Sequence, residues 1–373
     1  MSERDPVDEL SDLFVFLADN DFADYCPIYE IIARSVATDP ALLRAINEAA
    51  HPNTRRGRVP VLFFAATHDL ALANPSSELA AVYRGDSSRD VMAAFRHLID
   101  EHWPTLVTTM RSHSVQTNEV GRSAVLALAL TQALRGISSS PTFFEIGPSA
   151  GLNLFVDEFA IDFQKNGETI ASIGRSSSPV QLRCELRGPN TPTLPATVPT
   201  PALRSGMDPN PIDVTSTAQC RWLQACVWPG IPDRPERLRS ALEVARLDPP
   251  SLLRGDAVTD LEPALVELPD SHHLIVFSTW ALAYVTEEGR QRILDVIDRL
   301  GRQRDLDFIT FEEPRFTPWI DDLDHAIFES YRGDGTPTLL GLRSWRGGTE
   351  ESTALAIAHP HGRWIHWCKE NHG

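Results

Sequence analysis

An acid inside an apolar stretch is the first feature of this 373-residue sequence that could do chemistry. The segment PTFFEIGPSAGLNLFVDEF (141–159) places Glu145 among aromatic and aliphatic residues, two positions before Gly147. This pattern predicts a strand that ends near the acid and a small-residue loop that closes at Gly151. In a strand–loop–helix unit such a loop lies at the carboxyl edge of a parallel sheet, where ligands bind.

The loop does not match a dinucleotide site, because Ser149 stands where the middle of three glycines would be. An acid at the strand end would also repel a pyrophosphate. A carboxylate accepts hydrogen bonds and offsets positive charge, so Glu145 suits a cation or a pair of hydroxyls. S-adenosylmethionine carries an ammonium and a sulfonium, and an acidic strand before a small-residue loop is the usual opening of the methyltransferases that use it. The contacts expected from this segment are Glu145, Gly147, Ser149, Gly151 and Asn153.

Two further acids follow later strand candidates. GMDPNPID places Asp208 where a carboxylate could accept both hydroxyls of a ribose. RGDAVTDL places Asp256, followed by Ala257, where an acid could receive an adenine amino group. An Asx turn at Asp208 and a helix cap at Asp256 remain open alternatives. Asp208 follows the loop at a longer spacing than the roughly 20 residues of a simple nucleotide-binding unit, and a Pro/Ser/Thr-rich insertion at 165–204 explains the excess.

A polar cluster precedes the loop. QTNEVGR (116–122) brings Asn118, Glu119 and Arg122 to the start of a helix, where residues three or four apart share a face. We assign Arg122 to a carboxylate of the ligand, and Glu119 to orienting or deprotonating a nucleophile. A helix cap at Asn118 explains part of the same pattern.

Two later strand ends complete the candidate site. Ser278 and Thr279 follow the apolar run LIVF, where methyltransferases place groups beside the methyl donor. Glu312 ends the next strand candidate and could act as a base, with a solvated strand end as the alternative. The residues expected to be catalytic are Asn118, Glu119, Arg122 and Glu312. The residues expected to bind the cofactor are Glu145, Gly147, Ser149, Gly151, Asn153, Asp208, Asp256, Ala257 and Ser278.

The elements that must position these residues change character along the chain. Residues 1–135 show apolar spacings of three and four, which predict an all-helical N-terminal cap domain. Residues 136–373 alternate short apolar runs with helical ones, which predicts an α/β domain with a mainly parallel sheet and antiparallel edge strands at the C-terminus. We expect a helix over 150–163 and an inserted lid or hairpin at about 165–204.

The bulk composition narrows the class of protein. A formal charge of −17 argues against nucleic acid and anionic membranes as partners, so we expect a small-molecule substrate. The sequence shows no signal-peptide pattern and no apolar run of membrane-spanning length, which favours the cytoplasm. Five cysteines without a Cys-x-x-Cys pair favour reduced thiols, and HPHGRWIH (359–366) lacks nearby acids, so we expect no metal. A homodimer or a small partner subunit stays open.

Taken together, these segments resemble an uncharacterised bacterial family, a domain of unknown function with a methyltransferase-like Rossmann core. The resemblance implies a class I S-adenosylmethionine methyltransferase fold with a mostly parallel seven-stranded sheet and antiparallel C-terminal strands. The chain departs from the family pattern at Pro148, which removes a backbone donor, and at FITFEEP, where relatives carry a Trp-rich segment with Ser-Asn-Glu. The stretches that carry the resemblance are VQTNEVGRSA, EIGPSAGLNL, LRSGMDPNPIDV, RWLQACVWPGIPDRPERLRSALEVAR, PPSLLRGDAV and IVFSTWALAYV.

Three functions stay open from the sequence. The leading hypothesis is a methyltransferase that uses S-adenosylmethionine on a small polar metabolite, in natural-product biosynthesis, with rate gained from positioning and a general base. The second keeps the fold but catalyses elimination or intramolecular ring closure, as when an amine displaces sulfate to form an aziridine. The third is a non-catalytic subunit of a heteromeric enzyme.

Overall fold

Two compact units make up the chain. The computed structural model describes residues 5–369 apart from 24 and 53. One unit comprises Met1–Thr117 with Ser216–Arg239, and the other Asn118–Thr215 with Ser240–Gly373. The boundary therefore lies before residue 118, whereas the sequence led us to expect it at 135. The difference arises because α7 (Ser123–Ala133) packs against strands of the sheet.

The first unit is helical, as the apolar spacing predicts. α4 is buried along almost all of its length and forms the centre of this unit. α6 bends where His102 leaves helical geometry, two residues before Pro104. α8 joins the unit from far along the chain, since Arg221 pairs with Asp69 at 2.7 Å. The helices are α1 (Pro6–Leu17), α2 (Pro27–Ala37), α3 (Pro40–Ala49), α4 (Val59–Ala73), α5 (Glu78–Tyr83), α6 (Val91–Ser112) and α8 (Thr217–Ala225).

The second unit is built on one mixed sheet. The strand order is β3-β2-β4-β11-β10-β9-β8-β7-β1-β5-β6. The five neighbouring strands β6, β5, β1, β7 and β8 run parallel. After β1 the chain adds β5 and β6 on one side and then β7 and β8 on the other, so the strand order reverses between β1 and β7. The strands are β1 (Pro141–Ile146), β2 (Ala160–Lys165), β3 (Glu168–Gly174), β4 (Gln181–Arg187), β5 (Leu203–Asp208), β6 (Ser251–Arg254), β7 (His273–Thr279), β8 (Leu306–Glu312), β9 (Thr338–Arg346), β10 (Thr349–Ala358) and β11 (Trp364–Trp367).

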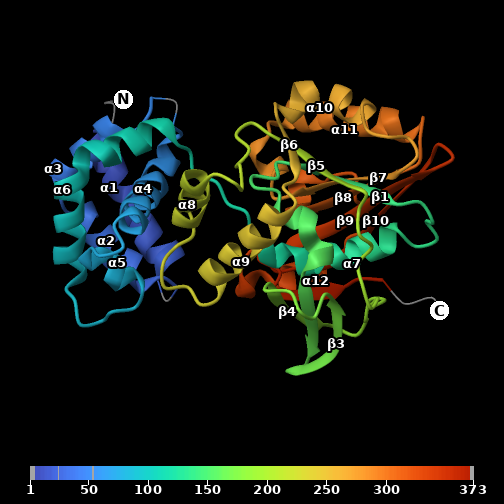
Figure 1. Ribbon diagram of the computed structural model, residues 1–373, viewed down its shortest axis with the longest axis horizontal. Helices are drawn as coiled ribbons and strands as arrows, with labels where there is room; N and C mark the ends of the chain where they lie inside the picture. The colour runs from blue at the N-terminus through green and yellow to red at the C-terminus, as the bar shows by residue number, and fades with distance from the viewer. Residues whose placement is uncertain (1–4, 24, 53, 370–373) are drawn as a thin grey trace. The chain divides into compact units, whose positions relative to one another are not determined.

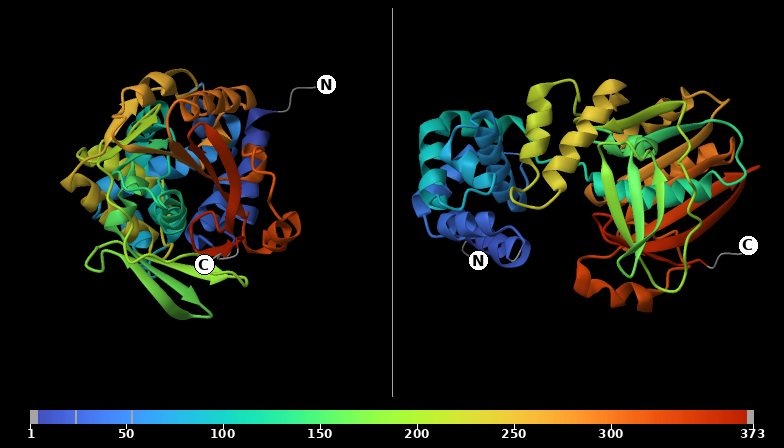
Figure 2. Two further views of the ribbon diagram at one scale, coloured as in Figure 1. Left: turned by 90° about the vertical axis from the view of Figure 1, so that its right-hand side faces the viewer. Right: turned by 60° about the horizontal axis from the view of Figure 1, so that its bottom comes forward.

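The C-terminal strands are antiparallel, as expected, but they do not form the edge of the sheet. β9 runs antiparallel to β8, and β10 antiparallel to β9. β11 then pairs in parallel with β4, which carries the sheet on through β2 to β3. The sheet therefore has eleven strands rather than the seven expected. The segment expected as an inserted lid or hairpin supplies β3 and β4 to this sheet, and Figure 2 shows these strands in green.

Helices cover both faces of the sheet. α10 (Ala257–Val266) and α11 (Glu287–Gly301) lie on one face and α7 on the other (Figure 1). Phe144 and Ile146 of β1 belong to the core shared with α10 and α11. Successive side chains of a strand point to opposite faces, so Phe143 and Glu145 point to the face that α7 covers. Glu145 is therefore buried by the geometry of its strand.

The helix expected over 150–163 is wrong. Leu152–Glu158 forms a short 3₁₀ segment, interrupted at Phe155, and β2 begins at Ala160. Arg204 stabilises this compact turn, because its guanidinium lies over the Phe155 ring and bonds to both oxygens of Asp157. The long apolar run thus divides into a turn and a strand, and the loop after β1 does not lead into an α-helix.

No helix in the described part of the chain is long and apolar enough to cross a membrane. The two remaining α-helices are α9 (Arg234–Leu247) and α12 (His325–Ser330).

None of the five cysteines, all of which the structure describes, forms a disulfide, and four of them are buried.

We predict that Gly301→Ala destabilises the protein by about 1–3 kcal/mol, although alanine normally favours a helix. A Cβ at Gly301 would lie 2.4 Å from the ring of Trp345, which is buried in the core, so the ring or the helix would have to shift. Urea unfolding measures the change. Gly333→Ala, whose added methyl would meet no atom within 4 Å, is the matched control. Equal unfolding free energies for the two variants would contradict this packing argument.

Candidate functional site

Glu145 is the centre of a buried polar cluster at the carboxyl end of β1. Only 1% of the residue is exposed. Its Oε1 accepts a hydrogen bond from Thr279 Oγ1 of β7 at 3.2 Å. Its Oε2 is buried and has no hydrogen-bond partner among the residues that the structure describes. One carboxyl oxygen is therefore held in place, and the other is buried without a partner among the described residues.

Side chains from two further segments, the turn after β1 and the start of α7, connect to this carboxyl group through Thr279. Asn153 Nδ2 donates to Thr279 Oγ1 at 3.4 Å, and Ser123 Oγ of α7 donates to Asn153 Oδ1 at 2.9 Å. Arg122 is also buried, and its Nη1 donates to the Thr279 carbonyl at 2.9 Å. Glu145, Asn153 and Arg122 all came from the sequence prediction, and the structure brings them together through Thr279.

Burial raises the pKa of Glu145 to about 8, against an ordinary value of 4.5. The hydrogen bond from Thr279, the nearby amide of Asn153 and the positive charge of Arg122 lower the pKa, but they do not outweigh the loss of water. At neutral pH the group therefore carries its proton. A carboxyl with a pKa in this range can give or accept a proton, or lose it when a cation binds beside it.

Asp208 holds the loop that follows β1. Its Oδ2 accepts the Ser149 N–H at 2.9 Å, and its Oδ1 accepts the Asn210 N–H at 2.8 Å. The second bond is the Asx turn that the sequence left open. Ser149 has a positive φ of 55°, and its buried Oγ has no hydrogen-bond partner within the described chain. A Cβ at Gly147 would lie 2.5 Å from that of Ala281, so this glycine permits close packing of the loop against the segment after β7.

Asn118 and Gly151 determine the backbone conformation of the loop after β1. Asn118 Oδ1 accepts the Leu152 N–H at 3.0 Å, so it joins the start of the α7 segment to the turn after the loop. Gly151 adopts a positive φ of 70°, and a Cβ there would lie 3.1 Å from Pro250 and from Leu154. Both residues fix the shape of the loop.

Ser278 and Glu312 lie on the opposite face of the sheet from Glu145. Their strands place them in line with Val276 and Phe308, which face α10 and α11. Glu312 Oε1 accepts hydrogen bonds from Ser278 Oγ at 2.7 Å and from the N–H groups of Ala281 and Leu282. The structure therefore places Glu312 as the residue that holds the turn after β7, and it does not bring its carboxyl group beside that of Glu145.

Asp256 lies at the tip of β6, two strands from β1. It is exposed and caps α10, because its Oδ1 accepts the Val258 N–H at 2.9 Å. Ala257 is the first residue of that helix. Glu145, Asp208 and Asp256 thus lie at or just after the ends of three adjacent parallel strands, β1, β5 and β6. The burial of these acids decreases in that order.

The turn between β10 and β11 adds residues that the sequence prediction missed. His361 Nδ1 lies 3.2 Å from Glu119 Oε2, and Arg122 Nε donates to the Pro360 carbonyl at 3.0 Å. The sequence prediction treated these histidines only as possible metal ligands. The glycine in HPHG is a signal for a tight turn, but nothing in the sequence links that turn to Glu119, which lies far earlier in the chain. Within the described chain, no group of three or more His, Cys, Asp or Glu could hold a metal ion.

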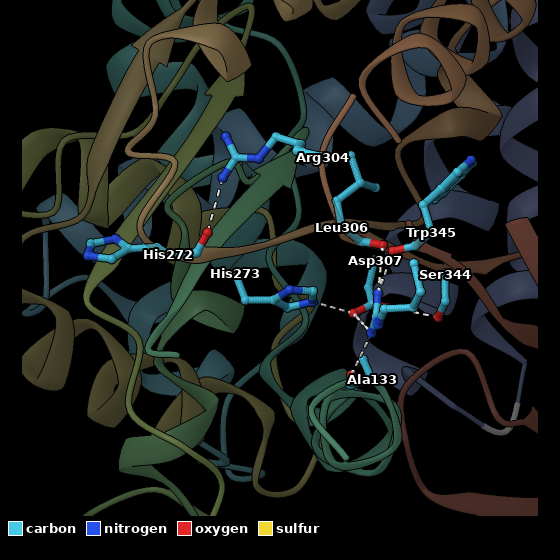
Figure 3. Close-up of polar contacts among 9 residues, drawn as sticks. Ala133, His272, His273, Arg304, Leu306, Asp307, Ser344 and Trp345 are labelled. Carbon is cyan, nitrogen blue, oxygen red and sulfur yellow. Dashed lines mark hydrogen bonds and ion pairs between the residues drawn. The ribbon is translucent and has the colours of Figure 1, made fainter. Parts of the chain in front are cut away.

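A second buried polar cluster lies at the opposite, amino edge of the same strands (Figure 3). Asp307 at the start of β8 contacts His273 Nε2 at 2.6 Å, Arg346 at 2.9 Å and the Ser344 hydroxyl. These residue types resemble a hydrolase triad, but here both the serine and the histidine contact the acid. A triad needs the histidine between the serine and the acid. Arg346 also donates to the Ala133 carbonyl, so this cluster attaches α7 to the sheet.

We predict that Glu145→Gln gains stability relative to wild type as pH rises from 4.5 to about 8. The native state keeps the Glu145 proton up to about pH 8, whereas the unfolded chain releases it near 4.5. Wild-type stability from this group is therefore complete below 4.5 and is lost across that window, and glutamine has no such proton. Urea unfolding at several pH values measures the difference. The exposed Glu168→Gln is the control. A pH-independent difference for Glu145→Gln would contradict the raised pKa.

Comparison with known proteins adds a family but no activity. No curated protein matches the chain. Residues 11–367 match a family described as "Uncharacterized protein conserved in bacteria (DUF2332)". The match covers the helical unit, the loop after β1, and the turn that carries His361. The chain therefore belongs to the DUF2332 family.

Proposed function

We propose that this protein is an enzyme that binds S-adenosylmethionine at the carboxyl edge of β1, β5 and β7 and methylates a small polar metabolite. The observation that carries the proposal is the buried Oε2 of Glu145, which no described residue satisfies. A buried polar atom without a partner costs free energy, and such atoms in native proteins are commonly explained by function. An ammonium group of a ligand would satisfy this oxygen and would favour the ionised form of the carboxyl group.

Charge supports an amino-acid group as the part of the ligand that is recognised. Arg122 lies close enough to Glu145 that its positive charge lowers the pKa of that acid. An acid and a guanidinium in one cluster complement the ammonium and the carboxylate of an α-amino acid. S-adenosylmethionine ends in such a group, and it supplies an electrophilic methyl when bound. The donors and acceptors present therefore fit this cofactor.

The strand order supports a methyltransferase-like core. In open parallel sheets ligands bind beyond the carboxyl ends of the strands, at the point where the strand order reverses. In this sheet that point lies between β1 and β7, where Glu145 and Thr279 meet. Asp208 and Asp256 follow the next two strands, and each carboxylate keeps lone pairs beyond those used by the backbone. We assign Asp208 to the ribose and Asp256 with Ala257 to the adenine.

Isothermal titration calorimetry with S-adenosylmethionine tests the proposal. We predict micromolar binding by wild type and binding at least about tenfold weaker by Glu145→Gln, because a hydrogen bond to a charged partner is lost. Glu168→Gln should bind as wild type does. Absence of binding by wild type at millimolar cofactor would contradict the proposed function.

One observation favours a second candidate, ring closure in which an amine displaces a leaving group such as sulfate. Pro148 has no N–H, and the Ser149 N–H is already bonded to Asp208. Both Asp208 oxygens also accept bonds from the protein itself. The loop thus offers a nucleoside fewer groups than a methyltransferase loop usually does, whereas Glu145 and Arg122 suit a substrate amine and an anionic leaving group equally well.

The second candidate makes a separate prediction. Wild type incubated with 2-aminoethyl hydrogen sulfate should release sulfate in the absence of S-adenosylmethionine, and Arg122→Gln should release far less. Ion chromatography measures the sulfate. Release no faster than without protein, together with micromolar binding of S-adenosylmethionine, would reject ring closure in favour of methyl transfer.

A further inference from the structure

The turn after β10 places a histidine next to a buried acid. His361 Nδ1 lies 3.2 Å from Glu119 Oε2, which is ion-pair distance. The Glu119 side chain is 3% exposed, and its other oxygen accepts the Gly121 N–H at 3.1 Å. A carboxylate beside one ring nitrogen of a histidine orients the ring and favours its protonated form. This is the usual arrangement of a histidine that transfers protons at its other nitrogen.

Backbone contacts fix the position of this pair. A Cβ at Gly362 would lie 2.0 Å from the Gly121 carbonyl oxygen, and a Cβ at Gly121 would lie 2.4 Å from the His361 carbonyl oxygen. Only glycine fits at either position, so the turn and the segment after Glu119 are in direct backbone contact. Arg122 adds a hydrogen bond to the Pro360 carbonyl. The backbone of His361 is therefore fixed beside the segment that carries Glu119.

The same contacts join the pair to Glu145. Arg122 bonds to the Pro360 carbonyl through Nε and to the Thr279 carbonyl through Nη1. Thr279 in turn donates to Glu145. A single buried guanidinium thus bridges the turn that carries His361 and the strand end that carries the candidate ligand-binding acid.

The His361 side chain is partly exposed, but not at the nitrogen that faces Glu119. His361 Nδ1 is itself buried, whereas the side chain as a whole is 31% exposed. The exposed surface therefore belongs to the other ring atoms or to Cβ. His359, the nearest histidine, is 7% exposed, and its Nδ1 accepts the His361 N–H at 3.0 Å. Of the two neighbouring histidines, His361 alone is both paired with an acid and partly exposed.

The charged groups around the turn are of both signs. Glu119 faces His361 from the segment before α7, and the guanidinium of Arg122 donates to the Pro360 carbonyl, one residue before His361. Burial lowers the pKa of His359 to about 4, and the charges of His361 and Arg363 lower it further. Asp334 and Glu119 act on His359 in the opposite direction. His359 is therefore neutral near physiological pH, and Glu119 is a charged group at ion-pair distance from His361.

We propose that Glu119 and His361 form the proton-transfer pair of this site, in which His361 accepts a proton at Nε2 and Glu119 is the positioning residue. The substrate of this step is the one given by the proposed function, on which this part of the inference rests. The N–H or O–H proton of the nucleophile passes to Nε2, and the electron pair that it leaves forms the new bond to carbon. The bond from that carbon to the departing sulfur or oxygen breaks, and its electron pair goes to the departing atom. The carboxylate of Glu119 stabilises the imidazolium that results.

NMR titration of the histidine side chains of the full chain tests the positioning role. We predict that Glu119→Gln lowers the His361 pKa by about 1, because the negative charge is lost while an acceptor for the Gly121 N–H is kept. Glu101→Gln is the matched control, since Glu101 lies 3.7 Å from the exposed His97 and should leave His361 unchanged. An unchanged His361 pKa in Glu119→Gln would overturn the pair.

Carbethoxylation of wild type by diethyl pyrocarbonate tests the accepting nitrogen without any variant. We predict that mass spectrometry finds His361 modified and the buried His359 protected, with the exposed His97 as the reference for full reactivity. An unmodified His361 after complete reaction of His97 would overturn the proton-accepting role. Neither readout needs S-adenosylmethionine, so a failure of the calorimetry would reject the proposed function and leave this pair to be decided on its own results.

Discussion

The burial of one carboxyl group determines the arrangement of the whole site. Glu145 lies in the middle strand of the parallel region, under α7, where a charge without a partner is costly. Its proton reduces that cost, and the hydrogen bond from Thr279 satisfies one of its oxygens. The second oxygen is left unsatisfied within the described chain. Hydrogen bonds of Arg122 and Asn153 then link this carboxyl group, through Thr279, to the turn at Pro360 and to α7.

Acids at the strand ends differ in role although their sequence settings are similar. Asp208 uses both oxygens on backbone N–H groups, and Glu312 uses Oε1 on two backbone N–H groups and the Ser278 hydroxyl, so each holds a loop in a fixed conformation. Glu145 accepts only from side chains, and Glu119 faces a histidine. Asp208 therefore fixes the loop after β1 and Glu312 fixes the turn after β7, whereas Glu145 and Glu119 are the acids that we propose for ligand binding and proton transfer.

The sequence predicted the parts that depend on local pattern. The strands at 141–146 and 273–279 and the helices of the first unit follow from periodicity, and the acid at the end of β1 follows from an unusual residue in an apolar run. The 3₁₀ turn at 152–158 was missed because Arg204, a distant residue, stabilises it. The contact between Glu119 and His361 was missed for the same reason. Because side chains alternate along a strand, Ser278 and Thr279 point to opposite faces of the sheet. The sequence does not identify which of these two faces also carries Glu145.

Infrared spectroscopy of the Glu145 carboxyl group tests the central claim most directly. A protonated carboxyl has a carbonyl stretching band distinct from that of a carboxylate, and glutamine at 145 abolishes the contribution of this one group. The account predicts that wild type minus Glu145→Gln shows the protonated band near neutral pH, and that the band disappears when S-adenosylmethionine or a substrate amine binds. A difference spectrum with only a carboxylate band, before any ligand is added, would contradict it.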